Sequence, residues 1–230
     1  MLPKPSSIGD QSALEWILFD LNGTLLDPAG IGEPLGLGPP ESLAALDEAV
    51  MQAMADTITG SSRAFPDYLE AALERRARAA GRQPEALGEA MERAARMPPF
   101  DDAAPAIEML AAAGLSVGVL TNSARRAAES ALSGAGLLDR LELVVGADEA
   151  GAYKPDARVY RKGVERTGVE AGAVCLVAAH GWDVLGAARA RLRTGWVARK
   201  EVELLATVPA PDFRGATLGA VAEQIVRATR

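Results

Sequence analysis

The chain has 230 residues, of which 49% are hydrophobic and 24% are charged, the balance of an ordinary globular protein rather than of a disordered or membrane-embedded chain. Its formal net charge of -7 argues against a general nucleic-acid-binding or anionic-membrane-binding surface, since both need clustered Lys and Arg. The single cysteine, Cys175, excludes an internal disulfide and is expected to be a small buried residue on a strand.

The N-terminal segment, Met1–Asp10, is polar and has no apolar stretch as long as that of a signal peptide. No window of the chain approaches the roughly 20 consecutive apolar residues of a membrane-spanning helix. A lone cysteine agrees with a reducing compartment. We therefore expect a cytoplasmic protein that acts on a small molecule and has neither nucleic acid nor membrane as a partner.

Apolar runs of strand length alternate with helical patterns along most of the chain. The expected strands are Trp16–Phe19, Leu115–Leu120, Leu141–Val145, Ala173–Ala178 and Gly195–Ala198. The expected helices are Ala103–Ala113, Ala124–Ala135, Ala157–Thr167 and Val184–Leu192. This alternation predicts an α/β fold with a Rossmann-like parallel sheet that is covered on both faces. Gly114, Gly136 and Gly168 stand where helices need left-handed caps.

One interval breaks the alternation. The Gly- and Pro-rich segment Pro28–Pro40 reads as a loop, and after it come only helical signals, in Glu41–Thr59, Pro66–Ala80 and Pro84–Arg96. We expect a core formed by residues 11–30 and 98–230, with residues 31–97 inserted as a helical cap. A cap over an active site would exclude water and strengthen electrostatic interactions there. A helical outer layer without a catalytic role is the alternative.

Polar residues follow four of the expected strands. In chain order these are Asp20 with Asn22 and Thr24, then Thr121-Asn122-Ser123, then Lys154, then His180-Gly181-Trp182-Asp183. The carboxyl ends of the strands in a doubly wound sheet meet at one crevice, so we expect these groups to lie together. Each motif also has a structural reading, because Lys-Pro before a helix often forms only a turn. Ser123 could likewise be only the N-cap of the helix that begins at Ala124.

A carboxylate at a strand end can attack a substrate and form a covalent ester. We assign Asp20 as this nucleophile and Lys154 as the cation that keeps it ionised and offsets charge in the transition state. Asp183 would orient either Lys154 or a hydrolytic water. Asn22 cannot carry a proton to a leaving group. The residues expected to position the attacked group are Thr24, Thr121 and Asn122.

The order of these motifs resembles that of the haloacid dehalogenase superfamily, over essentially Trp16 to Arg230. The resemblance is carried by Asp20 to Thr24, by Thr121, by Lys154 within Tyr153–Tyr160, and by the loop from His180 to Asp183. It implies a Rossmann-like core with a helical cap inserted after the first strand, and it suggests a homodimer.

Two departures separate the chain from the phosphatases of that superfamily. Those enzymes place an Asp at the position of Asn22 as a general acid/base, and an acidic Mg²⁺ ligand where Ala179 stands. Since Mg²⁺ prefers several hard oxygen ligands, Asp20 with a carbonyl oxygen would hold it weakly. We therefore expect no metal and no other cofactor. Mg²⁺ enters only under the alternative that the chain is a phosphatase or phosphomutase relative.

The residues from Tyr153 to Tyr160, together with those from His180 to Asp183, are most similar to the type II 2-haloacid dehalogenases. This resemblance implies metal-independent hydrolysis of a small 2-haloalkanoic acid, or a similar carboxylate, through an ester on Asp20. Carried over position by position, the catalytic residues are Asp20, Lys154 and Asp183. The substrate-binding residues are Asn22, Thr24, Thr121, Asn122, Tyr160 and His180.

The chain departs from those dehalogenases in the cap as well as at Asn22, where they commonly carry Tyr. They place an Arg early in the cap, near Leu46 or Asp47 of this chain, and Glu41–Thr59 contains no Arg. Arg63 is the nearest cap candidate, but we favour a solvated surface position for it. A catalytically silent binding protein is the remaining alternative, because these departures could mark lost activity.

His180 is the only histidine of the chain and stands where the better-known dehalogenases carry Asn. A general base is one interpretation, since imidazole titrates near neutral pH. Positioning a water, or packing beside Trp182, is the other.

Overall fold

Six strands form one sheet in which every neighbouring pair is parallel, in the order β3-β2-β1-β4-β5-β6. The strands are β1 (Trp16–Phe19), β2 (Ser116–Leu120), β3 (Leu143–Val145), β4 (Val174–Ala178), β5 (Arg193–Val197) and β6 (Phe213–Gly215). The computed structural model describes residues 13–229, so the expectation for Met1–Asp10, and residues 11 and 12 of the expected core, lie outside the described residues. The predicted α/β fold with a parallel sheet is confirmed.

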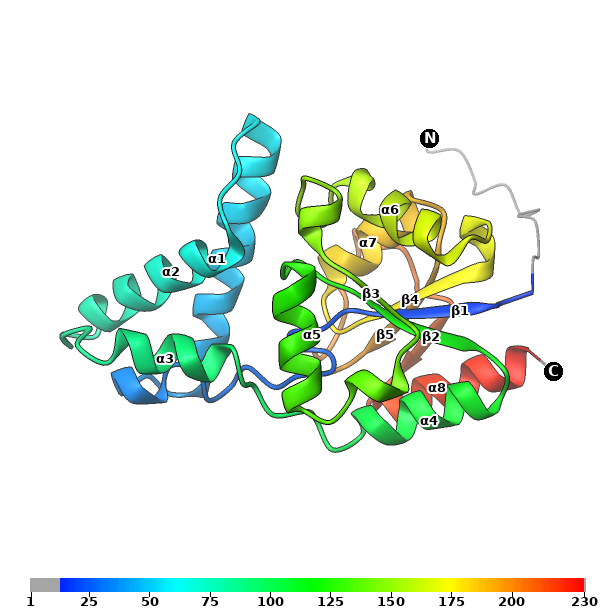
Figure 1. Cartoon of the computed structure of the whole chain (residues 1–230), viewed down its shortest axis with the longest axis horizontal. Coiled ribbons are helices and arrows are strands. Elements are labelled where there is room, and N and C mark those ends of the chain that lie inside the picture. Colours follow the sequence, from blue (N-terminus) through cyan, green and yellow to red (C-terminus); the bar gives the residue numbers. More distant parts are fainter. Residues whose placement is uncertain (1–12, 230) are drawn as a thin grey trace.

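Helices cover both faces of the sheet (Figure 1). On one face lie α4 (Ala103–Ala112), α5 (Arg125–Gly134) and α8 (Leu218–Ala228), and on the other lie α6 (Ala157–Thr167) and α7 (Gly181–Arg189). Residues of β1 alternate between the two layers, because Ile17 and Phe19 pack with the first group and Leu18 packs with the second. A strand buried on both faces has no place for a polar residue, which explains why β1 is an uninterrupted apolar run.

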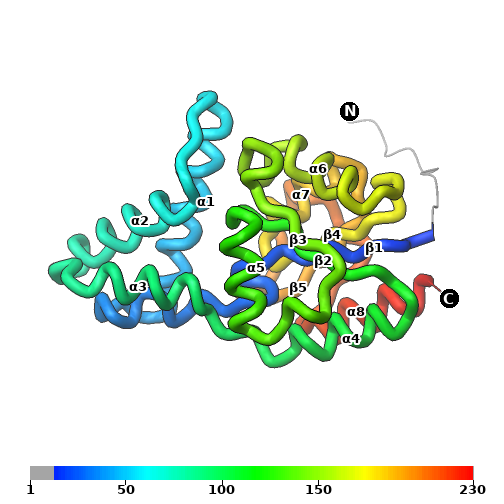
Figure 2. Tube along the Cα trace, in the orientation of Figure 1, coloured from blue at the N-terminus to red at the C-terminus, as the bar shows by residue number. Residues whose placement is uncertain are grey.

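Residues 31–97, which we call the helical insert, contain a short 3-10 turn at Glu33–Leu35 and three helices. These are α1 (Pro39–Thr59), α2 (Phe65–Ala79) and α3 (Leu87–Ala94). The insert lies beside the core, and α8 lies at the other end of the molecule (Figure 2). Its buried residues, such as Ala49 and Leu73, belong to the same apolar cluster as the α4 side of the sheet. The division into two domains at these residues stays a prediction.

The helix ends follow the expected signals, with one exception. Gly114, Gly136 and Gly168 have φ angles of 84°, 68° and 74°, the left-handed conformation that glycine adopts at low cost. The expectation that Ser123 caps α5 is wrong. The backbone N–H of Ser123 donates to Thr121 Oγ1, and the first turn of α5 is held by Asp148 Oδ1, which accepts from the backbone N–H of Arg125.

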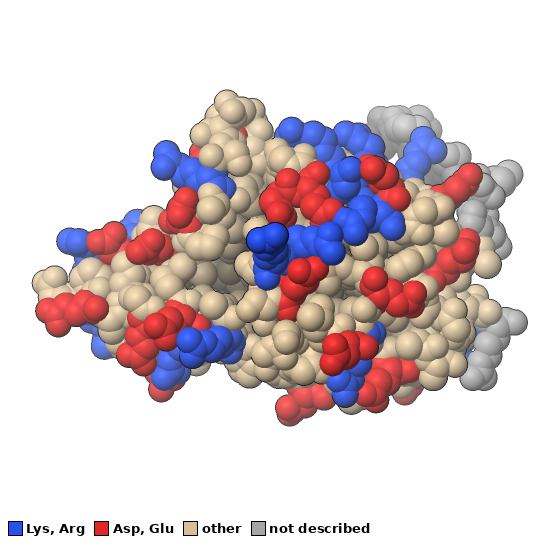
Figure 3. All heavy atoms as spheres, viewed as in Figure 1, with Lys and Arg blue, Asp and Glu red and all other residues tan. Residues whose placement is uncertain are grey.

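Two further expectations concern burial and surface. Cys175 is fully buried on β4, as expected of a small apolar side chain. On the face shown in Figure 3, basic and acidic side chains are interspersed. Between residues 13 and 229, no helix combines the length and the apolar character that crossing a membrane requires.

Candidate active site

The carboxyl ends of β1, β2 and β4 meet at the point where the order of the strands along the sheet reverses. The chain runs from β1 outward to β2 and β3, and then returns to place β4 on the other side of β1. Open parallel sheets bind their ligands at such a switch point. Asp20, Thr121 and His180 follow these three strands, so the fold brings together groups that lie far apart in the sequence.

A buried cluster of charges forms around Lys154. Its Nζ donates to Asp20 Oδ1 at 3.1 Å and to Asp183 Oδ2 at 2.7 Å. Thr24 Oγ1 donates to Asp20 Oδ2 at 2.9 Å, and the Tyr160 hydroxyl donates to Asp183 Oδ1 at 2.7 Å. Lys154 and Asp183 are 0% exposed and Asp20 is 6% exposed. Buried charges are costly unless they are paired and hydrogen-bonded, and here each carboxylate oxygen has a donor.

Local sequence explains how two of these donors reach their acceptors. A Cβ atom at Gly186 of α7 would lie 2.2 Å from the Tyr160 hydroxyl, so glycine is needed there for Tyr160 to reach Asp183. Thr24 Oγ1 also accepts from the backbone N–H of Ala179 at 3.0 Å, which ties the loop after β1 to the loop after β4.

The environment shifts the pKa values of Asp20 and Asp183 in opposite directions. Burial by itself would raise the pKa of Asp20, but the charge of Lys154 and the contacts with His180 and Thr24 outweigh it and hold that pKa below its usual range. Burial, together with the negative charge of Asp20, raises the pKa of Asp183 against the attraction of Lys154. Burial would lower the pKa of Lys154, but Asp183 and Asp20 raise it. Asp20 is therefore an ionised carboxylate beside a permanent cation.

A cavity of about 20 Å³ opens in front of Asp20. Residues of the core line one wall: Asp20, Asn22, Thr121, Asn122, His180 and Trp182. Residues of the helical insert line the other: Leu46, Asp47, Val50 and Phe65. The volume suits about one water molecule, which needs roughly 10–15 Å³ by this measure. We call this space the catalytic cavity.

The expected site residues therefore divide into two groups. Asp20, Asn22, Thr121, Asn122 and His180 face the catalytic cavity. Four others do not line it: Lys154, Asp183, Thr24 and Tyr160. Lys154 and Thr24 bind Asp20, while Asp183 binds Lys154 and Tyr160. Asp183 thus contacts Lys154 rather than the space for a hydrolytic water, and Tyr160, expected at the substrate, contacts Asp183.

Asn122 presents an unused donor. Its Oδ1 accepts from the backbone N–H of Lys154 at 2.8 Å, whereas its buried Nδ2 has no hydrogen-bond partner among the described residues. Because an unsatisfied buried donor costs free energy, Nδ2 is a natural contact for an acceptor atom in the catalytic cavity.

His180 lies directly against Asp20. Its Nδ1 is 3.3 Å from Asp20 Oδ2, but the approach is not aligned as a hydrogen bond, so the contact is electrostatic. Burial lowers the pKa of the imidazole, yet Asp20 outweighs this effect and the net pKa is raised. The ring stacks on Trp182 with centroids 5.3 Å apart. Gly23, at a φ of 81°, gives it room, since a Cβ there would lie 3.0 Å from His180 Cε1.

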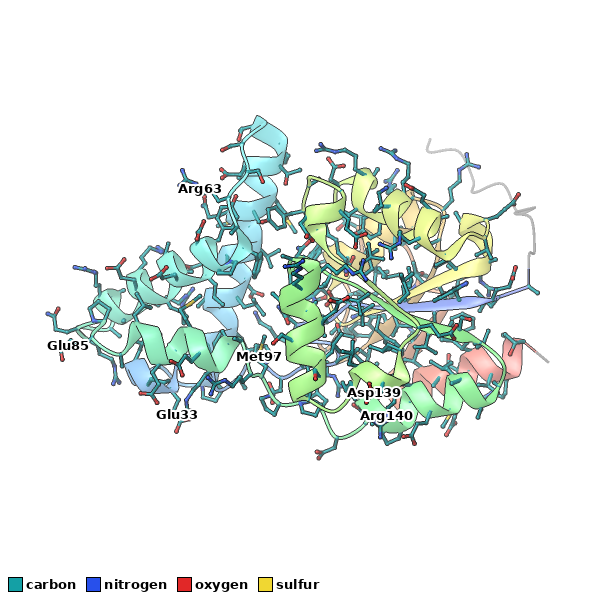
Figure 4. The ribbon with its side chains drawn as sticks, viewed as in Figure 1. Glu33, Arg63, Glu85, Met97, Asp139 and Arg140 are labelled. Atoms are coloured by element: carbon teal, nitrogen blue, oxygen red, sulfur yellow. The ribbon has the colours of Figure 1, made fainter. Side chains whose placement is uncertain are left out.

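Arg63 lies away from this site. Its side chain is 68% exposed, pairs with Asp56 at 3.5 Å and projects from the outer side of the insert (Figure 4). The preference for a solvated surface residue is confirmed. Leu46 and Asp47, where the resemblance would place a cap arginine, do face the catalytic cavity, but they bring no cation to it.

The sequence reasoning missed two cations near the site. Arg199 and Lys200 follow β5, and Lys200 forms an ion pair with Asp47 of the insert. The same signal that marked four other strand ends, a polar residue directly after an apolar run, was present here. The apolar wall of the insert, Leu46, Val50 and Phe65, could not be found in this way, because helix faces that line a cavity have the same periodicity as faces packed in a core.

The donor set does not suit Mg²⁺. The oxygens of Asp20 are engaged by Lys154 and Thr24, those of Asp183 by Lys154 and Tyr160. The residue after β4 is Ala179, which offers no side-chain oxygen. Among residues 13–229, no group of three or more His, Cys, Asp or Glu side chains is arranged to hold a metal ion. Mg²⁺ prefers several hard oxygen ligands, and Asp20 is the one carboxylate of the cluster that lines the catalytic cavity.

Comparison with known proteins identifies relatives of this chain. A family model described as haloacid dehalogenase-like hydrolase matches residues 14–191. An (S)-2-haloacid dehalogenase of Pseudomonas sp. (strain YL) is 29% identical over 128 residues, which cover 56% of this chain and 55% of that protein. (S)-2-haloacid dehalogenase 4A of Burkholderia cepacia is 38% identical over 91 residues, 39% of each chain. The matched parts are thus about half of these relatives or less.

Solved structures show the same fold over nearly the whole chain. The L-2-haloacid dehalogenase from Xanthobacter autotrophicus, solved with chloropropionic acid covalently bound, superposes with a TM-score of 0.85 at 23% identity, covering 94% of this chain and all of that one. A HAD phosphatase from Thermococcus onnurineus superposes with a TM-score of 0.61 at 23% identity, covering 92% and 98%. At such identities the likeness concerns the fold alone.

Proposed function

The chain belongs to the haloacid dehalogenase-like hydrolases, and from that premise we propose that it hydrolyses a small 2-haloalkanoic acid, or a similar carboxylate, through an ester on Asp20 and without a metal ion. The observation that carries the proposal is the position of Lys154, buried between Asp20 and Asp183 behind a cavity that lacks a second free carboxylate. Lys154 supplies a positive charge beside Asp20 without a metal ion.

In the first step, an oxygen of Asp20 attacks the α-carbon of the substrate, the carbon–halogen bond breaks, and halide leaves with its electron pair. The leaving group needs no proton, so Asn22 in place of an acid is compatible with this step. Lys154 keeps Asp20 ionised, and Nδ2 of Asn122 would donate to the substrate carboxylate. Leu46, Val50 and Phe65 would surround the carbon atoms.

In the second step, water adds to the carbonyl carbon of the ester, the bond between that carbon and the substrate oxygen breaks, and a 2-hydroxy acid leaves. Overall, haloacid and water become hydroxy acid, halide and a proton. His180 is the base that the geometry favours. Ester formation removes the negative charge of Asp20 that raises the pKa of His180, and this favours the neutral imidazole that can accept a proton from water.

The small volume of the catalytic cavity requires the wall of the insert to move before a substrate enters. That wall comes from α1 and α2 alone, whereas the reacting groups all belong to the core. A displacement of the insert would therefore open the site, and it would break the hydrogen bonds that Tyr153 makes with Thr57 and Arg63 of the insert. On this view the insert acts as a cap that closes over the substrate and excludes water.

The test is halide release from 2-bromopropanoate, measured with and without EDTA. We expect bromide release that EDTA does not change and that Asp20→Asn abolishes, while circular dichroism shows that the variant is folded. Mass spectrometry of the protein after rapid quenching should show the ester on Asp20. Folded protein that releases no halide from any short 2-halo acid, or that releases it only with added Mg²⁺, would contradict the proposal.

A Mg²⁺-dependent phosphatase remains testable in the same preparation with p-nitrophenyl phosphate. A catalytically silent binding protein would form no covalent adduct with either class of compound. Both alternatives therefore predict a result that differs from the leading proposal.

A further inference from the structure

A second and larger cavity lies beside the catalytic cavity. Its volume is about 350 Å³, against about 20 Å³, and the two share Leu46, Asp47 and His180 in their walls. Pockets for small organic ligands usually measure about 300–1,000 Å³, so only the larger space has room for a substrate chain. We call it the side pocket. Because the two cavities share these wall residues, the side pocket adjoins the catalytic cavity.

The walls of the side pocket are mainly apolar. Side chains of the insert and of the core contribute: Leu43, Leu46, Phe100, Ala179 and Ala198. None of these except Leu46 lines the catalytic cavity. Hydrocarbon surface that enters such a pocket leaves water at a gain in free energy, without any need for a specific partner.

Both cations of the side pocket are paired with carboxylates, whereas its other acidic residue, Asp27, accepts from the backbone N–H of Ala29. Lys200 binds Asp47, and Arg199 binds Asp102 at 2.5 Å while its guanidinium stacks over the Phe100 ring at 3.8 Å. An anionic ligand would compete with these pairs and would lie beside the carboxylate of Asp27, whereas an apolar chain can lie between them. The pocket therefore favours hydrocarbon over a second anionic group.

We propose that the side pocket binds the carbon chain of the substrate, so that the enzyme prefers 2-halogenated carboxylic acids whose unbranched apolar chain is longer than that of propanoate. The proposal rests on the proposed function for the reacting end of the molecule. Leu46 and His180 stand between the two spaces, and displacement of the Leu46 side chain, which the insert carries on α1, joins them. The carboxylate and the halogen then lie in the catalytic cavity and the chain runs past Leu46.

The first experiment compares kcat/KM for 2-bromooctanoate and 2-bromopropanoate. Each methylene moved from water to an apolar wall is worth about threefold to fourfold, so several of them should give a ratio of at least about tenfold in favour of the longer acid. A ratio of one or less overturns the proposal while leaving the proposed function intact, because the short acid still releases bromide.

Two variants locate the effect. Leu43→Trp fills the side pocket from α1, and we expect it to lower the ratio by about tenfold or more, since it removes room for several methylenes. Met51→Trp is the matched control, because Met51 lies on the same helix with 57% exposure and lines neither cavity. Its ratio should equal that of the wild type. If Leu43→Trp does not fold, Ala198→Phe fills the same pocket from the core side.

A binding measurement keeps the proposal independent of turnover. By isothermal titration calorimetry, octanoate should bind at least about tenfold more tightly than propanoate to the wild-type protein, and Leu43→Trp should remove the difference. If no bromide is released from any bromo acid but octanoate binds in this way, the proposed function is wrong, whereas the proposal that the side pocket binds an apolar chain is supported. Equal binding of octanoate and propanoate overturns the side pocket.

Discussion

The two walls of the catalytic cavity differ in chemistry. The core wall presents a carboxylate, two amides, a hydroxyl and an imidazole, and a buried ammonium group stands directly behind it. The insert wall presents Leu46, Val50 and Phe65, and its one charged residue, Asp47, is paired at the surface with Lys200. Under the proposed mechanism, the core would supply the groups that make and break bonds, while the insert would supply shape and exclude water.

The physical reason is how firmly the core and the insert each fix the positions of their side chains. The rim of a parallel sheet fixes the ends of strands that come from distant parts of the chain, and Lys154 and Asp20 are 134 residues apart. Such a cluster is pre-organised, because its members are held by strand ends and by the helices α6 and α7 that pack on the sheet. Amphipathic helices instead bury a stripe of apolar side chains, whose composition can change without breaking a network.

Removal of the Lys154 cation should lower both the stability of the protein and its activity. In Lys154→Met, Asp20 and Asp183 become two buried carboxylates without a counter-charge, so we expect a loss of about 3–5 kcal/mol in the free energy of unfolding. Activity should fall by about 10²- to 10³-fold or more, because the charge of the ester-forming step is no longer offset. Urea denaturation and bromide release measure the two effects.

Lys162→Met is the matched control. Its partner Glu165 lies one helical turn away at the surface of α6, with 65% of the side chain exposed, and exposed pairs contribute less than about 1 kcal/mol. A loss of stability in Lys154→Met no larger than in Lys162→Met would contradict the role assigned to the buried cluster.

A second substitution separates the two chemical steps on the core wall. His180→Gln keeps hydrogen-bonding capacity but removes the base, so ester formation should persist while its hydrolysis slows by about 10²-fold. Quenched-flow mass spectrometry should then show the ester accumulating on Asp20. A variant that forms less ester, or none, would show that His180 acts before the hydrolytic step.

The stability of the same variant, relative to the wild type, should depend on pH. The folded-state pKa of His180 is raised by Asp20, so its contribution to stability is fully present below the unfolded pKa of about 6.5 and is lost as pH rises through the folded pKa. The wild-type protein should therefore exceed His180→Gln in stability by more at about pH 5.5 than at about pH 9. Denaturant unfolding at both values checks the sign, and a larger difference at the alkaline value would contradict it.

A change on the insert wall should alter preference rather than chemistry. Val50→Ala enlarges the catalytic cavity by two methyl groups, so the ratio of kcat/KM for 2-bromobutanoate over 2-bromopropanoate should rise by about threefold to tenfold. Val164→Ala, on α6 and away from the cavity, is the control that should leave the ratio unchanged. Loss of turnover with every substrate would mean that the insert takes part in the chemistry itself.

The smallest effect is expected where the two regions meet at the surface. Lys200 and Asp47 are 43% and 49% exposed in their side chains, so Lys200→Gln should change the free energy of unfolding by less than about 1 kcal/mol, and less still in high salt. Urea titrations at two salt concentrations measure this. A loss comparable to that in Lys154→Met would erase the distinction between buried and exposed pairs.

Much of the fold could be read from pattern alone. The helix Ala157–Thr167 is found with the predicted bounds, and four predicted strands differ from the observed ones by one or two residues. The sixth strand, β6, was not predicted. Phe213 is its only buried residue, so its three residues show no periodic pattern. Helix α8 escaped although Thr217 caps it through the backbone N–H of Ala220, a signal present in the sequence.

The sequence by itself determined the parallel sheet and the order of polar groups at its strand ends, because burial on both faces forces an apolar run and leaves charge only where the run stops. Only the tertiary structure decided which of those groups face the cavity and which support them from behind. Tyr160 and Asp183 belong to the second set because their distance from Asp20 is set by how α6 and α7 pack on the sheet, with Gly186 allowing the contact. Spacing along the chain carries no record of such packing.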